Sequence, residues 1–337
     1  MPNDTAMTPP SLLAERIEAH LASHLHAGDH WEGYLASSAL ATATAGFALD
    51  FAGTPDDLPL VQSAAQWLLD HQNPDGGWGD TPDSPSNLST TLLALSFLER
   101  RLDPTRLTDA RQCLLRFLGD DSPTARARGI LDWYGRDRTF AVPILTQVAL
   151  AGGRETPSAW SLFPALPFEA GLIPRRFYQA IRLPVVSYAL PALLALGLCH
   201  AHQAPPRNPL LRLIRRLARP RALHLLAQLQ PESGGYLEAI PLTAFVVMAL
   251  TGAGNGAHPV AQRGLTFLRA GRRPDGSWPI DTHLATWLTS LAIAAGAQGR
   301  SSHAPLLATR REALTRWLLD RQWKRTHPFT LSPPGGW

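Results

Sequence analysis

The sequence contains very little lysine, cysteine or methionine. Among its 337 residues are two cysteines, three methionines and a single lysine, Lys324, so nearly every basic residue is arginine. Cys113 and Cys199 lie far apart within apolar patterns, and no metal-ligand spacing surrounds either of them. We therefore expect two free, buried thiols of a reducing cytoplasm and no structural metal site.

Long apolar runs and a leader segment are also missing. Residues 1–20 show no basic start followed by an apolar core, and the longest apolar run, 185–199, is interrupted by Pro191. This pattern predicts neither a signal peptide nor a membrane-spanning helix. With 45% hydrophobic and 17% charged residues, the composition is typical of a globular protein with a large core.

Negative charge is absent from a long central stretch. Residues 170–231 contain nine arginines and no Asp or Glu, and because the whole chain carries +4, the rest carries −5. Part of this excess lies in 208–220, where Asn208 and Pro209 favour a helix start and Pro220 a helix end. Two helical faces alternate there: Leu210, Leu213, Ile214 and Leu217 on one, and Arg212, Arg215, Arg216 and Arg219 on the other.

Three interpretations of this basic amphipathic helix stay open. Its apolar face, flanked by Arg212 and Arg216, suits a contact with the surface of an anionic membrane. Alternatively, the apolar face packs on the protein core and the arginines are solvated. Nucleic-acid binding is the weakest interpretation, because no aromatic residues interleave the arginines.

One residue pattern occurs four times. Segments 72–78, 230–236, 272–278 and a stretched version at 322–337 share the order Gln or Arg, turn, Gly, aromatic, and 28–33 is a degenerate copy. A helical pattern stands on either side, so each segment is interpreted as a helix–turn–helix connector. We expect each aromatic ring to lie on the backbone of a neighbouring unit and each Gln amide to bond helix-end peptide groups. The residues that define the pattern are Gln72, Gly77, Trp78, Gln230, Gly235, Tyr236, Gly276, Trp278, Gln322 and Trp337.

The helical patterns predict an all-α protein of helix hairpins. More apolar members, such as the alanine-rich 39–48, alternate with amphipathic members, which favours a closed, double-layered α/α barrel over an open solenoid. The proline-rich segment 136–191 is not expected to be a run of plain helices.

The repeats and their surroundings resemble the squalene-hopene cyclase family of triterpene cyclases, within the prenyltransferase and squalene cyclase repeat superfamily. The similarity includes the proline-rich segment 160–194 and the units 234–250 and 275–295. This resemblance implies two α/α barrels with an apolar substrate cavity between them. Residues 1–20 would be a tail and first helix, 21–270 the non-acidic second barrel, and 271–337 the opening helices of the catalytic barrel.

The resemblance also implies a location and a set of partners. The helix at 208–220 falls where the family contacts the membrane, which implies a cytoplasmic protein attached to the inner face of the cell membrane. The ligand would be squalene or a related polyprenyl chain, with no cofactor, metal or nucleic acid.

The acid of the family is not found in this sequence. These enzymes protonate an alkene with an Asp-x-Asp-Asp motif, and the chain has none. Asp56-Asp57 and Asp120-Asp121 fit turn or cap positions, and Asp281 fits a helix N-cap, so no catalytic residue is assigned. We expect the first half of a cyclase, incomplete at its C-terminus and inactive without a second polypeptide that carries the acid.

Five residues are candidates for the substrate cavity by the same resemblance. Leu183 stands where the family has a tryptophan, Pro241 and Trp287 match cavity-side positions, and Phe177 and Tyr178 belong to the proline-rich segment. Pro241 and Trp287 also fit a helix-start proline and a core tryptophan. A carboxylate of the early inner helix is replaced here by Thr42 and Thr44.

Two other functions compete with the cyclase hypothesis. The first is a non-catalytic helical-repeat protein that binds lipid or a partner at the membrane surface. The second is a protein prenyltransferase β-subunit, which needs an Asp/Cys/His zinc site that the cysteines here do not form. The Gly-Cys-Gly-Glu-Gln thioester motif of another group of α/α domains is absent.

Overall fold

The computed structural model describes residues 10–33, 35–152, 157–173, 189–298, 304–326 and 333–337. These residues form helices and turns, with three isolated β-bridges and no longer strand among them. The chain divides into two compact units, one formed by Leu35–Thr282 and the other by Met1–Tyr34 together with His283–Trp337. The boundaries predicted from family resemblance, at residues 20 and 270, remain a prediction.

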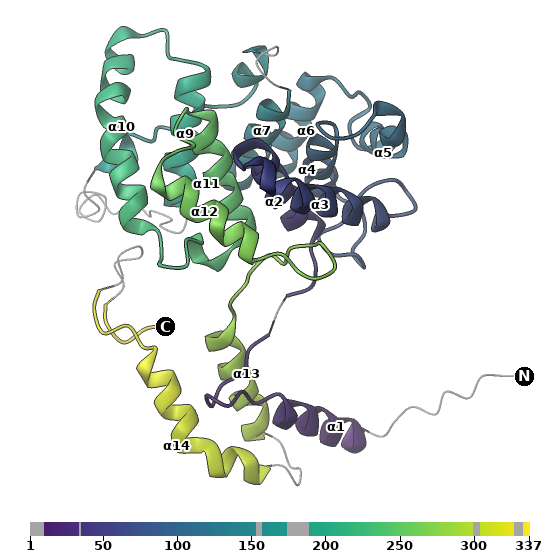
Figure 1. Ribbon diagram of the computed structural model, residues 1–337, viewed down its shortest axis with the longest axis vertical. Helices are drawn as coiled ribbons and strands as arrows, with labels where there is room; N and C mark the ends of the chain where they lie inside the picture. Colours follow the sequence, from purple (N-terminus) through teal and green to yellow (C-terminus); the bar gives the residue numbers. More distant parts are fainter. Residues whose placement is uncertain (1–9, 34, 153–156, 174–188, 299–303, 327–332) are drawn as a thin grey trace, which may run out of the picture. The chain divides into compact units, whose positions relative to one another are not determined.

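The core of the unit Leu35–Thr282 is a closed ring of inner helices. Each helix contacts the next, and the last contacts the first (Figure 1). The predicted closed α/α ring is therefore confirmed. Because the ring closes, each inner helix packs between two other inner helices. In ring order the inner helices are α2 (Ala39–Ala52), α4 (Leu88–Leu98), α7 (Arg138–Ala151), α9 (Leu190–Gln203) and α11 (Ile240–Gly252).

Outer helices cover this ring. They differ from the inner helices in amphipathicity: every residue of α4 is buried, whereas the outer helix beside α2 buries one stripe formed by Val61, Ala64, Ala65, Trp67 and Leu68. Beside α2, α4, α7, α9 and α11, respectively, lie α3 (Leu58–Asp70), α5 (Thr108–Leu118), α6 (Pro123–Tyr134), α10 (Pro209–Leu229) and α12 (Pro259–Ala270).

One sequence expectation about a helix end is wrong: Pro220 does not end the basic helix, because α10 continues through it to Leu229. In its described residues the proline-rich segment 136–191 is, as expected, not a run of plain helices. Helix α7, which accommodates Pro143 in its second turn, is followed there by the short 3-10 helices Pro157–Ser161 and Ala170–Leu172. In both α10 and α7 a buried face of small and apolar residues stabilises the backbone against the lost N–H donor.

An ion pair joins the first and last outer helices of the ring. Arg269 of α12 donates to Asp57, beside the start of α3, over 2.6 and 2.9 Å. Asp57 also accepts from the backbone N–H of Thr54 at 2.8 Å and is almost completely buried. The contact links residues 212 positions apart, so it reinforces closure.

The second unit combines the two ends of the sequence. It contains α1 (Pro10–Ser23), α13 (Ala285–Gln298) and α14 (Ala304–Asp320). Its small core contains Trp31, Ala292 and Leu314, with partly buried neighbours Leu21, Leu25, Leu288 and Ile293. None of the helices among the described residues is both long and apolar enough to cross a bilayer.

Candidate functional site

The repeated connector has a defined backbone geometry. In 72–78, the N–H of Gly76 donates to the carbonyl of Asn73 and the N–H of Asn73 donates to the carbonyl of Gly77. Gly76 has a φ of +83°, and an added Cβ would stand 2.4 Å from the carbonyl oxygen of Asp109. Glycine is required here by conformation and by space.

The Gln amide closes the same turn in each of three copies, and in one of them it also bonds a peptide group in the first turn of a helix. Gln72 donates through Nε2 to the carbonyl of Gly76 at 2.7 Å, and Gln230 to that of Gly234 at 2.8 Å. Gln322 donates to the carbonyl of Gly335 at 2.7 Å, so the stretched copy has the same contact across a longer loop. Gln230 also donates to the carbonyl of Val260.

Each aromatic side chain donates to the end of the helix that precedes its own turn. The acceptor is the carbonyl ten residues earlier: Leu68 for Trp78 at 2.7 Å, Leu226 for Tyr236 at 2.8 Å, and Leu268 for Trp278 at 2.7 Å. Trp31 and Leu21 repeat this contact at 2.8 Å, and Trp337 donates to Leu318 across its longer loop. These bonds attach the polar atom of each side chain to the preceding helix, and the expected contact of the rings with the backbone of a neighbouring unit stays a prediction.

A threonine hydroxyl on a helix accepts a hydrogen bond from the backbone N–H of each of four aromatics. Two pairs are close in sequence, Trp78 with Thr91 at 3.1 Å and Tyr236 with Thr243 at 2.9 Å. The other two are distant, Trp278 with Thr42 at 3.0 Å and Trp31 with Thr289 at 2.9 Å. Thr42, which occupies a position expected to be a carboxylate, therefore has a structural role that sequence reasoning missed.

The structure describes only part of the expected substrate cavity. Phe177, Tyr178 and Leu183 lie outside the described residues. Pro241 is a partly buried residue in the first turn of α11, as a helix-start proline would be. Trp287, on α13, is 56% exposed, so its interpretation as a core tryptophan is wrong. The latter two belong to different units, and their role in one cavity remains a prediction.

The paired aspartates act as caps and ion-pair partners. Asp57 contacts Arg269, Asp121 contacts Arg126 at 2.6 Å, and Asp120 accepts from the backbone N–H of Ser122. The Arg269 guanidinium, with Thr54, holds the pKa of Asp57 below its ordinary range. The hydrogen bonds from Ser122 likewise hold the pKa of Asp120 below its ordinary range, so Asp57 and Asp120 are stabilised in the ionised form, which is the opposite of what a proton donor needs.

Asp281 differs from these residues. Burial raises the pKa of its carboxyl group, the direction that favours a general acid. It precedes Ala285, the first residue of α13, by four positions, so the predicted N-cap role is wrong. No hydrogen bond joins it to a second carboxyl in the described part of the chain, and a single carboxyl is a weak acid for an alkene.

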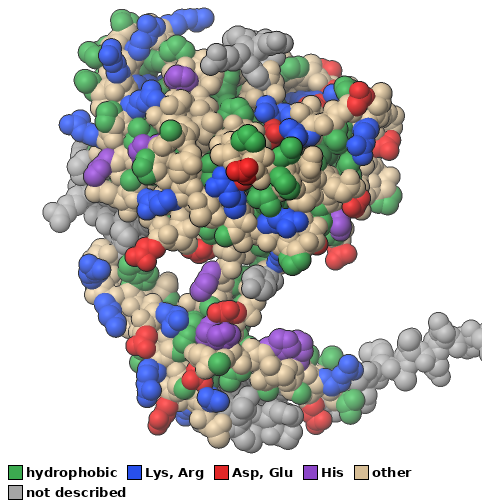
Figure 2. Space-filling model, in the orientation of Figure 1, with side chains coloured by type: hydrophobic (Ala, Val, Ile, Leu, Met, Phe, Trp, Pro, Cys, Tyr) green, Lys and Arg blue, Asp and Glu red, His purple; other side chains and the backbone are tan. Residues whose placement is uncertain are grey.

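The N-terminal half of helix α10 presents four apolar side chains to solvent. Leu210, Leu213, Ile214 and Leu217 are 63%, 52%, 44% and 62% exposed. The opposite face is held by the protein: Arg215 pairs with Glu169 at 3.3 Å, and Arg219 donates to the carbonyl of Ala253 at 3.0 Å. Figure 2 shows basic and hydrophobic side chains together over α10. The interpretation in which the leucine face packs on the core is wrong.

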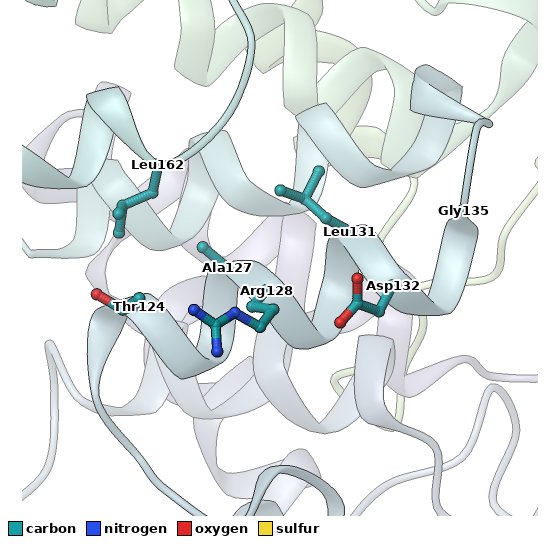
Figure 3. Close-up of a pocket in the computed structure, with 7 residues that line it drawn as sticks. All are labelled: Thr124, Ala127, Arg128, Leu131, Asp132, Gly135 and Leu162. Carbon is teal, nitrogen blue, oxygen red and sulfur yellow. The ribbon is translucent and has the colours of Figure 1, made fainter.

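The groove shown in Figure 3 is a separate feature on the outer layer. It has a volume of about 530 Å³ and is lined by Thr124, Ala127, Arg128, Leu131, Asp132, Gly135 and Leu162. Arg128 and Asp132 are its charged residues, and both lie on α6 (Figure 3). It contains none of the predicted cavity residues and shows no arrangement suited to a long apolar substrate.

Comparison with known proteins identifies the first third of the chain. Residues 14–120 match the family model described as the squalene-hopene cyclase N-terminal domain. Within residues 14–120 the chain is therefore similar to the N-terminal region of the squalene cyclase family. This match covers α2, α3, α4 and α5, together with the turn that contains Trp78.

One curated relative and one solved structure describe the extent of the similarity. A squalene hopane cyclase, afumA, of Aspergillus fumigatus (strain CBS 144.89 / FGSC A1163 / CEA10) is 30% identical over 151 residues, which cover 44% of this chain and 18% of the relative. The chain thus aligns with less than a fifth of that protein's length. A crystal structure of a protein from Actinoplanes matches with 18% identity and a TM-score of 0.31, covering 79% of this chain and 82% of the other.

Proposed function

We propose that this chain is part of a triterpene cyclase that cyclises squalene or a related polyprenyl chain. The family match at 14–120 is the observation that carries this proposal. The closed ring and its aromatic turns support it, because they supply a rigid scaffold of the kind that holds a long apolar ligand at a defined position.

The acid would come from outside the described residues. Protonating an alkene requires a carboxyl that is protonated and unusually acidic, which clustered carboxyls can provide. Here Asp57 and Asp121 are engaged by arginines, and Asp281 stands without a carboxyl partner in the described segments. The chain would therefore act together with an acid-bearing half, supplied by a second polypeptide or by further sequence.

Squalene turnover tests this function. The purified chain is incubated with squalene in detergent or vesicles, alone and together with the product of the adjacent open reading frame, and cyclised products are measured by gas chromatography and mass spectrometry. We expect no product from the chain alone and cyclised triterpene from the pair. A pair in which every Asp of the partner's acidic motif is replaced by Asn is the control. Absence of product from the intact pair would contradict the proposal.

The second candidate function is lipid or partner binding at the membrane surface without catalysis. The exposed stripe Leu210, Leu213, Ile214 and Leu217 favours it, because four large apolar side chains on one helix face are costly in water and suit a headgroup boundary. Arg212 and Arg216 flank the stripe and are exposed, so they can approach anionic lipid, each contributing about 1 kcal/mol. The same contact would place a cyclase beside its lipid substrate, on the inner face of the cell membrane.

Co-sedimentation with liposomes tests the membrane contact. We expect the chain to bind vesicles containing anionic lipid more tightly than zwitterionic vesicles, and Leu213→Asp with Leu217→Asp to abolish the difference. Leu115→Asp is the matched control, since Leu115 is 42% exposed on α5, away from this stripe. Equal binding by the double variant and the control would contradict a contact through α10.

A further inference from the structure

The degenerate copy at 28–33 and the two residues before it carry two histidines, His26 and His30, at the positions of Asn73 and Gly77 in the copy at 72–78. His30 precedes Trp31 as Gly77 precedes Trp78, and the N–H of His26 donates to the carbonyl of His30 at 2.8 Å as Asn73 does to Gly77. Asp29, with a φ of +57°, occupies the position of the positive-φ glycine. The backbone of the turn is therefore retained while its side chains are replaced by groups that can bind metal.

Three potential ligands meet at this turn. One donor atom each from His26, His30 and Glu32 lies within 4.8 Å of the other two. The Oε1 atom of Glu32 is 2.8 Å from Nε2 of His30, and the two imidazole rings are 4.7 Å apart. Two imidazoles and one carboxylate form a ligand set that Zn²⁺ and related divalent ions accept, with a further position for water.

The His30 ring is buried and fixed, yet one of its nitrogens has no partner. The residue is 7% exposed and stacks on Trp317 of α14 with ring centroids 4.7 Å apart. Its Nδ1 has no hydrogen-bond partner among the described residues and lies 3.3 Å from where a Cβ on Gly28 would stand. A buried nitrogen without a partner is uncommon and costly, and a metal ion in the space left by Gly28 would satisfy it.

The charge around the turn is consistent with a cation site. Glu32 is an exposed carboxylate whose one ion-pair contact among the described residues is with His30, at 2.8 Å. The neighbouring carboxylate of Asp29 is engaged by Arg310 at 3.0 Å. Trp31, bonded to Leu21 and Thr289, fixes the turn from the other side.

We propose that His26, His30 and Glu32 bind a divalent transition-metal ion of the Zn²⁺ class. His30 supplies an imidazole nitrogen that is already oriented, His26 the second imidazole, and Glu32 a carboxylate that either ligates the ion or orients His30 through its other nitrogen. The bound ion fixes the N-terminal turn against α14, whose Trp317 stacks on His30. This site goes beyond the proposed cyclase chemistry, which takes no metal.

Metal titration of the full, untagged chain tests the site. We expect isothermal titration calorimetry to show one equivalent of Zn²⁺ bound, and Co²⁺ to give the visible absorption of a low-coordinate nitrogen and oxygen site. His26→Ala and Glu32→Gln should each weaken Zn²⁺ binding by at least about tenfold. His26 and Glu32 are exposed, so these variants should retain the wild-type circular dichroism spectrum.

Two control variants locate the binding. His224→Ala changes an exposed histidine of α10 and should leave Zn²⁺ binding unchanged. His24→Ala should also leave it unchanged, because the Nδ1 atom of His24 is already within hydrogen-bond distance of the carbonyl of His20. No binding by the wild type, unchanged binding by His26→Ala, or loss of binding in His24→Ala would each overturn the proposal.

Discussion

Replacing Trp278 by Phe should measure what the side chain of the repeated aromatic contributes to the stability of the protein. Trp278 is completely buried, and its indole N–H donates to the carbonyl of Leu268 at 2.7 Å. Leu268 follows Phe267, whose carbonyl accepts the capping hydrogen bond at the end of α12. Phe fits the apolar surroundings but leaves the buried carbonyl of Leu268 without its donor, which costs about 1–3 kcal/mol. The smaller ring also leaves a cavity, so we expect a total loss of about 2–4 kcal/mol.

Two variants separate the hydrogen bond from the cavity. Tyr236→Phe removes only the hydroxyl that bonds Leu226, whose carbonyl also accepts from the N–H of Gln230, so we expect a loss of about 1 kcal/mol. Trp337→Phe alters the same kind of contact at a side chain that is 59% exposed, and should change stability by no more than about 0.5 kcal/mol. The free energy of unfolding is measured by urea denaturation with circular dichroism. Equal losses for Trp278→Phe and Trp337→Phe would refute the reasoning.

Three further predictions concern single contacts of the ring. Asp57→Asn should destabilise the protein most at neutral pH. Because the pKa of Asp57 is lowered in the folded state, the stability that its ionised carboxylate contributes is present above the unfolded pKa of about 3.9 and is lost as pH falls through the folded pKa. The unfolding free energies of wild type and variant, measured by urea melts, should therefore converge in acid. Gly76→Ala should destabilise the protein more than Gly119→Ala. Both glycines have positive φ, but only at Gly76 would the added Cβ stand 2.4 Å from a backbone carbonyl oxygen. Equal decreases of the two melting temperatures would contradict this prediction. Neither thiol should react with a disulfide reagent at pH 7.5 before unfolding, because burial raises the pKa of Cys199 to about 12 and also raises that of Cys113; rapid labelling of the native chain would contradict their burial.

The helical layers were predictable from local sequence, and the exceptions are instructive. Apolar inner and amphipathic outer patterns are properties of short windows, so the alternation and the closed ring followed from them. The end of α10 did not, because Pro220 is a strong local stop signal that the packing of Ala218, Ala222 and Leu226 overrides. The orientation of α10 also depends on tertiary partners: Glu169 and Ala253 engage its arginines, and both lie outside the helix.

The turns were predictable as turns, but their partners were not. A Gln, a glycine and an aromatic in fixed order indicate a connector, whereas the acceptor of the indole is an ordinary leucine carbonyl that no side-chain pattern marks. The threonines were missed for a related reason. Thr42 and Thr91 lie in apolar helices. From sequence alone, a threonine there is equally compatible with a core residue that bonds only its own helix and with a specific hydrogen-bond acceptor for a turn.

The threonine contacts explain how one unit lies within the sequence of the other. In local copies the turn and its hydroxyl are close along the chain, as for Trp78 with Thr91. In the other two copies the threonine lies far away in the sequence. The turn after α12 donates to Thr42 of α2, and the turn after α1 donates to Thr289 of α13. Residues 35–282 are therefore inserted in the sequence between the turn that contains Trp31 and α13, the helix that carries its partner Thr289. Each of these two contacts, Trp31 with Thr289 and Trp278 with Thr42, forms within a single unit. What the repeat preserves is the pairing of turn and hydroxyl in space, and adjacency along the chain is dispensable.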